Sequence, residues 1–211
     1  MISLGIDIGG TGCKCVAFSD AGKQLALSYE EYPLAAGTVN LPPEILAKSV
    51  FHVIRDCADK LQNMNDIAAI TVSSFGESFV AIDEDGNALD DIRMYFGNSE
   101  SATFDALVEK VGTEKFMDIC RILPDSSYSL AKMLYTMEIA PRPVWKFLFI
   151  AGYISYRLSG KAVTDVSLAC RSLLYTSSSG CSLYRSIYLL TKWRRLRHPT
   201  THLFAMHLTL P

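Results

Sequence analysis

A glycine-rich turn between two apolar segments near the N-terminus constrains the fold of this chain more than any other feature. Residues 2–8 form a short apolar run that suits a strand buried on both faces. Three glycines lie within residues 9–12, and residues 14–19 have the composition of a second strand. After a short Asp-Ala-Gly turn, residues 23–32 alternate well enough to form a third strand. The sequence therefore predicts three antiparallel strands with a glycine turn at the first hairpin.

The residues in and around the glycine turn suit the binding of phosphate groups. Gly9 and Gly10 allow backbone N–H groups to approach phosphate oxygens without hindrance from a Cβ atom. The Thr11 hydroxyl adds a donor, and Lys14 adds a positive charge for a terminal phosphate. Asp7, at the carboxyl end of the first strand, would face a Mg²⁺ ion through water. We therefore interpret the turn as an ATP-phosphate site rather than a plain hairpin, and the sequence contains no G-x-x-x-x-G-K-[ST] loop.

The segments that follow indicate an α/β protein. Two prolines open an amphipathic helix that ends near Leu61, and residues 67–72 form an apolar strand after it. An acidic-glycine turn at residues 83–87 lies between two strand-like segments, 79–82 and 88–92, which predicts a hairpin. Further helices are predicted at residues 101–111, 113–118, 129–138 and 151–158, the last of them ending at Gly160.

Four segments, in this order, resemble motifs of the FGGY carbohydrate kinases, which phosphorylate pentuloses, glycerol, gluconate and related polyols. Residues 5–14 are similar to the family's D-x-G-T-S-x-x-K phosphate hairpin, and residues 70–86 to its strand and hairpin with the sugar-contacting loop. Residues 94–100 stand in the place of its D-x-R loop. Residues 153–174 are close to its Y-x-x-Y-x-L-T-G and T-D-x-S-x-A-x-R motifs. The resemblance covers roughly residues 1–175. It implies an α/β, ribonuclease-H-like domain of the actin/hexokinase ATPase type, with a mixed central sheet and flanking helices.

The resemblance also implies the cofactors, which would be ATP and Mg²⁺. In that arrangement Asp7 organises the metal, and Gly9, Gly10, Thr11 and Lys14 hold phosphate. The family's catalytic base is an aspartate near the start of its C-terminal domain, and it takes the proton from the attacking hydroxyl. No acidic residue of this chain stands in that place, so we assign no catalytic residue and expect the chain alone to be inactive.

On the sugar side, the resemblance implies contacts from Phe75, Gly76, Glu77 and Asn98. Asn98 stands where the family usually has aspartate, and Glu100 where it usually has arginine. An amide can still hydrogen-bond a sugar hydroxyl, whereas glutamate in place of arginine reverses the local charge. Glu77 stands where many relatives have histidine, and it is either a sugar contact or a solvated loop carboxylate.

The composition changes abruptly towards the C-terminus. After Asp165 there is no aspartate or glutamate, whereas lysine and arginine continue. The two explanations are a basic tail that binds nucleic acid or membrane and a stretch outside the native reading frame, and we favour the second. We therefore expect a kinase N-terminal domain at residues 1–176, an atypical basic tail at residues 177–211, and no C-terminal kinase domain.

Bulk composition limits the partners. A net charge of −2 gives no electrostatic case for nucleic acid or an anionic membrane as a partner. Six cysteines without tight paired spacings indicate reduced thiols rather than a disulfide framework. Because Asp7 interrupts the first apolar run and no basic segment precedes it, we expect no signal peptide. We expect a cytoplasmic protein that acts on a small sugar or polyol, and the sequence leaves a homodimer open.

Two alternative functions also remain open at this point. One is a non-catalytic sugar-binding, nucleotide-binding or regulatory lobe. The other is a different ATPase of the actin/hexokinase superfamily, which would share the first motif. An acyl-dehydratase activator, for example, would need a cysteine pair for an iron–sulfur cluster, and the scattered cysteines do not supply a convincing one.

Overall fold

A mixed four-stranded sheet forms the larger part of the fold. The computed structural model describes residues 1–94 and 102–175. The strands of this sheet are β1 (Ile2–Ile8), β2 (Gly12–Ser19), β3 (Gln24–Glu31) and β4 (Ile67–Ser74). Their spatial order is β3-β2-β1-β4; β2 pairs antiparallel with both neighbours, and β4 joins β1 in parallel. This arrangement confirms the predicted antiparallel start and the α/β class.

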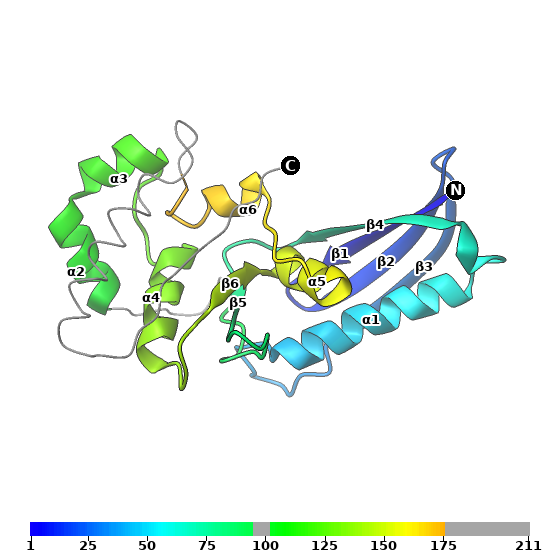
Figure 1. Cartoon of the computed structure of the whole chain (residues 1–211), viewed down its shortest axis with the longest axis horizontal. Coiled ribbons are helices and arrows are strands. Elements are labelled where there is room, and N and C mark those ends of the chain that lie inside the picture. The colour runs from blue at the N-terminus through cyan, green and yellow to red at the C-terminus, as the bar shows by residue number, and fades with distance from the viewer. Residues whose placement is uncertain (95–101, 176–211) are drawn as a thin grey trace.

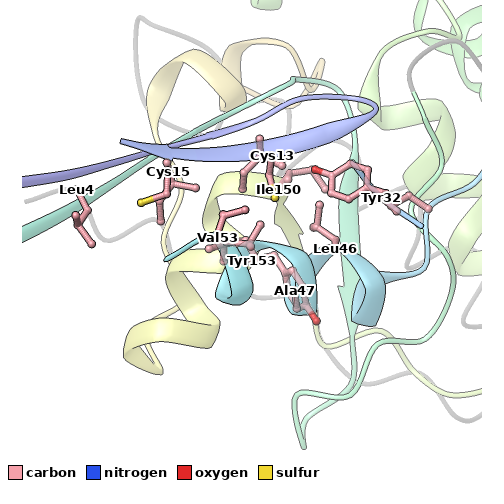
Figure 2. Close-up of a cluster of buried hydrophobic side chains, with 14 of the residues drawn as sticks. Leu4, Cys13, Cys15, Tyr32, Leu46, Ala47, Val53, Ile150 and Tyr153 are labelled. Atoms are coloured by element: carbon pink, nitrogen blue, oxygen red, sulfur yellow. The ribbon is translucent and has the colours of Figure 1, made fainter. Parts of the chain in front are cut away.

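The long helix α1 (Pro43–Asp59) connects β3 to β4 and covers one face of the sheet (Figure 1). Proline is tolerated at its start because the first N–H groups of a helix have no partner inside the helix. Its apolar stripe packs against the inward-facing side chains of β1 and β2 (Figure 2). The almost fully buried members of this core include Leu4, Ile6, Ile8, Leu46, Val50 and Val53. Each such side chain stabilises the fold by about 1.5–3 kcal/mol.

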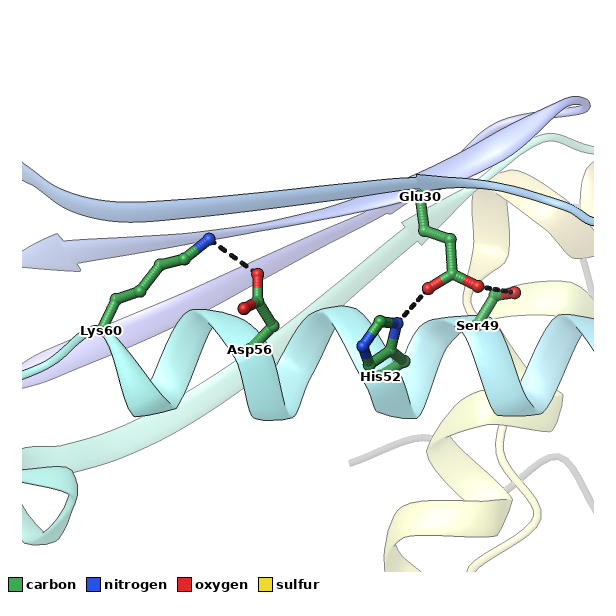
Figure 3. A network of polar contacts seen from close by, with 5 residues as sticks. All are labelled: Glu30, Ser49, His52, Asp56 and Lys60. Carbon is green, nitrogen blue, oxygen red and sulfur yellow. Dashed lines mark hydrogen bonds and ion pairs between the residues drawn. The ribbon is translucent and has the colours of Figure 1, made fainter.

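Polar contacts fix the same helix against β3 (Figure 3). Ser49 Oγ donates a hydrogen bond to Glu30 Oε1 at 2.8 Å, and His52 Nδ1 contacts Glu30 Oε2. Burial of the Glu30 carboxyl raises its pKa, but the hydrogen bonds from His52 and Ser49 outweigh this effect and lower the pKa below its ordinary value. Further along, Lys60 Nζ donates to the backbone oxygen of Leu27 at 2.9 Å. This bond occupies an acceptor on an edge strand, which would otherwise invite another strand.

A second, smaller sheet pairs β5 (Phe79–Ile82) with β6 (Lys146–Phe149) in antiparallel register. The sequence analysis predicted no strand at β6. The predicted acidic-glycine turn at residues 83–87 is present. The Asp83 N–H donates to the Asn87 oxygen across it, and Gly86 has a φ of 84°, which suits glycine. After the turn, however, the predicted second strand makes a single bridge to β5, from Ala88 to Ile82.

The helices predicted for the second half of the chain are confirmed. They are α2 (Ala102–Val111), α3 (Thr113–Cys120), α4 (Ser129–Ile139) and α5 (Ile150–Ser159). α5 ends at Gly160, whose φ of 72° suits glycine. Two short elements were not predicted: the 3₁₀ turn Met64–Asp66, and α6 (Val166–Cys170), which Asp165 caps.

Figure 1 shows α2, α3 and α4 gathered on the far side of β5 and β6 from the four-stranded sheet, while α5 lies beside that sheet and α1. A separate hydrophobic cluster, which includes Phe104, Phe116 and Leu130, holds α2, α3 and α4 together. Within residues 1–94 and 102–175, no helix is long and apolar enough to cross a membrane.

Candidate functional site

The charged residues of the first hairpin lie opposite each other. Asp7 on β1 and Lys14 on β2 are cross-strand partners, and Lys14 Nζ is 2.9 Å from Asp7 Oδ2. Both side chains point away from the core covered by α1, and about half of each is exposed, 49% for Lys14 and 55% for Asp7. Because both side chains are about half exposed, both groups are accessible to a ligand. An ion pair this exposed contributes little to stability, so a ligand could replace it at low cost.

Three carbonyl groups of the glycine turn, those of Gly9, Thr11 and Gly12, accept hydrogen bonds from the protein. The Gly9 N–H donates to the Gly12 oxygen at 2.8 Å. Tyr32, directly after β3, donates twice: its phenol to the Gly9 oxygen at 3.1 Å and its backbone N–H to the Thr11 oxygen at 3.0 Å. The N–H groups of Gly10 and Thr11 have no acceptor within the described part of the chain. The Gly10 N–H belongs to the same trans peptide as the Gly9 oxygen, so it points away from Tyr32. Unpaired N–H groups in a turn can form an anion-binding concavity.

The need for glycine in this turn comes from close approach of the backbone rather than from left-handed φ angles. A Cβ atom on Gly12 would lie 2.5 Å from the Glu30 backbone oxygen and 3.0 Å from Tyr29 Oη. A Cβ atom on Gly9 would lie 3.1 Å from the Gly12 oxygen. The sequence analysis explained the glycines by access for phosphate. The structure adds a second reason, which is that β3 runs directly against the start of β2.

The loop after β4 begins beside the glycine turn. Because β4 is parallel to β1, Ser73 is the register partner of Asp7, and both strands end at the same edge of the sheet. The Phe75 N–H donates to the Ile8 oxygen at 3.1 Å, and the Ser74 hydroxyl accepts a bond from the Ala151 N–H at 3.1 Å. Phe75, the first of the predicted sugar-side residues, is therefore hydrogen-bonded to the end of the strand that leads into the glycine turn.

Glu77 is neither free nor simply solvated. Arg171 donates to Glu77 Oε1 from both Nε, at 2.7 Å, and a terminal nitrogen, and 15% of the Glu77 side chain is exposed. The hydrogen bonds that Arg171 donates to the Glu77 carboxylate raise the pKa of Arg171, whose guanidinium also lies 5.0 Å from the centre of the Tyr128 ring. Glu77 has a φ of 64°, an unfavourable value for glutamate. This ion pair fixes one carboxylate oxygen, so any sugar contact would depend on the other.

A buried lysine beside Glu77 was missed by the sequence analysis. Lys132 on α4 is fully buried, and its Nζ contacts the Ser127 backbone oxygen. Burial lowers the pKa of Lys132, while the carboxylates of Glu77 and Asp125 oppose that shift. No pattern in the sequence distinguishes this lysine from a solvated helix residue. Arg171, by contrast, lies in the fourth family-like segment and could have been found there.

The other predicted site residues are Gly76 and Asn98 on the sugar side and Asp7 as the metal ligand. A Cβ on Gly76 would lie 3.8 Å from the Leu168 side chain, so this glycine packs against α6. Asn98 and Glu100 lie outside the described residues. Among the residues that are described, no three His, Cys, Asp or Glu side chains cluster as metal ligands. A single carboxylate, Asp7, nonetheless fits Mg²⁺, because this ion keeps several waters and binds substrate phosphates with one or two protein carboxylates.

The model of the FGGY family of carbohydrate kinases, N-terminal domain, matches residues 2–180. The chain belongs to this family. Curated relatives agree with it: a xylulose kinase of Staphylococcus xylosus is 20% identical over 179 residues, which are 82% of this chain and 37% of that protein. A glycerol kinase of Chelativorans is 29% identical over 189 residues, or 83% of this chain and 38% of that protein.

Solved structures show the same fold for this FGGY chain. The ligand-bound xylulose kinase of Lactobacillus acidophilus superposes with a TM-score of 0.76 at 22% identity, over 88% of this chain and 39% of that one. The Plasmodium falciparum glycerol kinase with ADP gives a TM-score of 0.75 at 15% identity, over 90% and 41%. The chain therefore spans well under half the length of the kinases it matches.

Proposed function

We propose that this chain is the phosphate-binding lobe of a kinase that transfers the γ-phosphoryl group of ATP to a hydroxyl of a sugar or polyol. The observation that carries the proposal is the first hairpin, where an accessible Asp7–Lys14 pair stands beside a turn with three hydrogen-bonded carbonyl groups and, within the described residues, two unpaired N–H groups. Family membership supports the same conclusion, and so does the resemblance in fold to a glycerol kinase solved with ADP.

In this proposal each group of the hairpin has a separate task. The N–H groups around Gly10 and Thr11 bind phosphate oxygens, and the Lys14 ammonium neutralises charge on the terminal phosphate. Mg²⁺, when bound, would supply positive charge that offsets the charge developing on the phosphates during transfer. The Asp7 carboxylate would hold that ion, directly or through its waters. Phe75, Gly76, Glu77 and the predicted contact Asn98 form the sugar side.

The transfer reaction itself needs more than this lobe. The sugar hydroxyl oxygen forms a bond to the γ-phosphorus, the bond to ADP breaks, and a base accepts the hydroxyl proton. We propose that residues 1–176 are the N-terminal domain and that the base and the adenosine pocket belong to a C-terminal domain of the kinase. The chain alone is then expected to bind polyphosphate without catalysing transfer. The free thiols of all five described cysteines support a cytoplasmic location.

The test combines a binding measurement with an activity assay on the purified 211-residue chain. Inorganic tripolyphosphate with Mg²⁺ is the probe for binding, because it presents the phosphates of ATP without requiring an adenosine pocket. Activity is followed as ADP release from ATP with xylulose, glycerol, gluconate and fuculose in turn. We expect binding but no sugar-dependent ADP release. Absence of tripolyphosphate binding would overturn the phosphate site, and sugar-dependent turnover would overturn the incompleteness of the catalytic machinery.

A further inference from the structure

We propose that Tyr32 is a positioning residue for phosphate binding, which holds the glycine turn with its carbonyl groups inward so that its N–H groups face the ligand. This inference rests on the proposed function, because it concerns how the same turn receives phosphate. It adds a residue that lies outside the turn in sequence and that would not itself touch the phosphate.

Tyr32 donates hydrogen bonds to two carbonyl groups of the turn. Its phenol oxygen is 3.1 Å from the Gly9 oxygen, and its backbone nitrogen is 3.0 Å from the Thr11 oxygen. The third inward carbonyl, that of Gly12, accepts from the Gly9 N–H at 2.8 Å. Tyr32 therefore supplies two of the three donors that bind the carbonyl groups of the turn. Of these two donors, only the phenol can be removed by replacing the side chain.

The direction of these carbonyls matters because a phosphate group carries negative charge. A carbonyl oxygen that swings outward would present partial negative charge to the ligand and would turn the neighbouring N–H away from it. Turns that bind anions therefore need their peptide groups fixed before the ligand arrives. A hydrogen bond from Tyr32 to the Gly9 oxygen provides this fixation at the first peptide group of the turn.

The phenol is well suited to act as a permanent donor. Tyr32 is 6% exposed, and its ring lies in the hydrophobic core near Cys13 (Figure 2). Burial raises the pKa of Tyr32, and Cys13, Tyr29 and Asp7 raise it further. The phenol therefore stays protonated, and packing holds the ring in one orientation. Phenylalanine would fill the same space without the donor, so Tyr32→Phe isolates the hydrogen bond from the packing.

Tyr153 on α5 offers a matched control. It is 1% exposed and belongs to the same hydrophobic cluster, and its phenol oxygen accepts a bond from Arg157 at 2.7 Å. Tyr153→Phe thus removes one buried phenol and one hydrogen bond away from the glycine turn. Both variants should lose a similar amount of stability, which makes general destabilisation visible as an effect common to the two.

The first measurement is the affinity of the full chain for magnesium tripolyphosphate. The ligand is titrated at a temperature where all variants are folded, and binding is monitored through the backbone amide NMR signals. We expect Tyr32→Phe to bind about fivefold more weakly than the wild type, as loss of one hydrogen bond predicts. Tyr153→Phe should bind as the wild type does. Equal affinity of Tyr32→Phe and wild type, or equal losses in both variants, would overturn the inference.

A second measurement needs no ligand and separates this inference from the proposed function. Hydrogen exchange of the Gly9 amide reports the bond to the Gly12 oxygen, and we expect it to be about fivefold faster in Tyr32→Phe but not in Tyr153→Phe. Unchanged exchange would contradict the role of Tyr32 in holding the turn. If the wild type failed to bind tripolyphosphate, the proposed function would be contradicted. Faster exchange of the Gly9 amide in Tyr32→Phe would still support the role of Tyr32 in fixing the glycine turn.

Discussion

The two sides of the candidate site are built from contacts of very different range in the sequence. On the phosphate side, Asp7 meets Lys14 and Gly9 meets Gly12 within a single hairpin. On the sugar side, Glu77 is held by Arg171, which lies 94 positions later in the chain. The phosphate side therefore depends on pairing within the first three strands and on Tyr32 directly after them, whereas the sugar side depends on the packing of α6 and α4 against the loop after β4.

The two sides of the site also differ in how freely their charged side chains can move. The Asp7–Lys14 pair is about half exposed and can rearrange around a ligand. Glu77 has an unfavourable φ and a mostly buried carboxylate that is bound to a guanidinium, so its movement would break several interactions at once. The phosphate side thus has accessible charged groups, whereas the one described carboxylate of the sugar side is already bound to Arg171.

The largest effect on stability is expected from a side chain that forces β2 and β3 apart. In Gly12→Ala the new Cβ would lie 2.5 Å from the Glu30 backbone oxygen, which cannot move without distorting β3. We expect a loss of about 2 kcal/mol in the free energy of unfolding, measured by urea denaturation.

Gly5→Ala on β1 is the control for this substitution. Its Cβ would meet nothing closer than the Val16 backbone oxygen at 4.0 Å, so its stability should stay within about 0.5 kcal/mol of the wild type. Equal stability of the two variants would show that the hairpin tolerates separation of β2 from β3, and it would remove the structural reason for Gly12.

A smaller effect is expected from the ion pair on the sugar side. A double-mutant cycle with Glu77→Gln and Arg171→Met should give a coupling energy of about 1 kcal/mol, because the carboxylate is mostly buried and accepts two hydrogen bonds. Urea denaturation of the wild type, both single variants and the double variant measures it.

The Glu44–Arg157 pair supplies the comparison cycle. It is longer, at 3.3 Å, and its carboxylate is 76% exposed, so the coupling should be near zero. A Glu77–Arg171 coupling no larger than that of Glu44–Arg157 would mean that the long-range pair does not fix the sugar side.

The sequence predicted the fold of the first hairpin and of α1 well because their signals are local. The apolar run of β1, the glycine turn and the position of Lys14 all act over a few residues, and α1 shows its helical period clearly. β6 was missed because it ends at Phe149 and α5 begins at Ile150, so one apolar stretch contains a strand and a helix with no turn between them. Short apolar runs do not separate the two by periodicity.

The residues around the predicted site were harder to find for a related reason. Tyr32 sits among aromatic and acidic residues at the end of β3, and nothing in the sequence shows that its phenol reaches Gly9. Lys132 occupies a helix position that looks solvated, yet α4 is covered there. The partner of Glu77 could be identified only when the fold brought Arg171 to it. Such contacts are set by tertiary packing rather than by local pattern.

The central claim is that Lys14 and the glycine turn bind phosphate, and tripolyphosphate affinity of Lys14→Met tests it most directly. Lys60→Met is the matched control, since Lys60 is equally exposed, is paired with Asp56 at 2.6 Å and carries the same charge away from the turn. If Lys14 binds phosphate, tripolyphosphate should bind at least about tenfold more weakly to Lys14→Met and with unchanged affinity to Lys60→Met. Equal affinities of the two variants would contradict it.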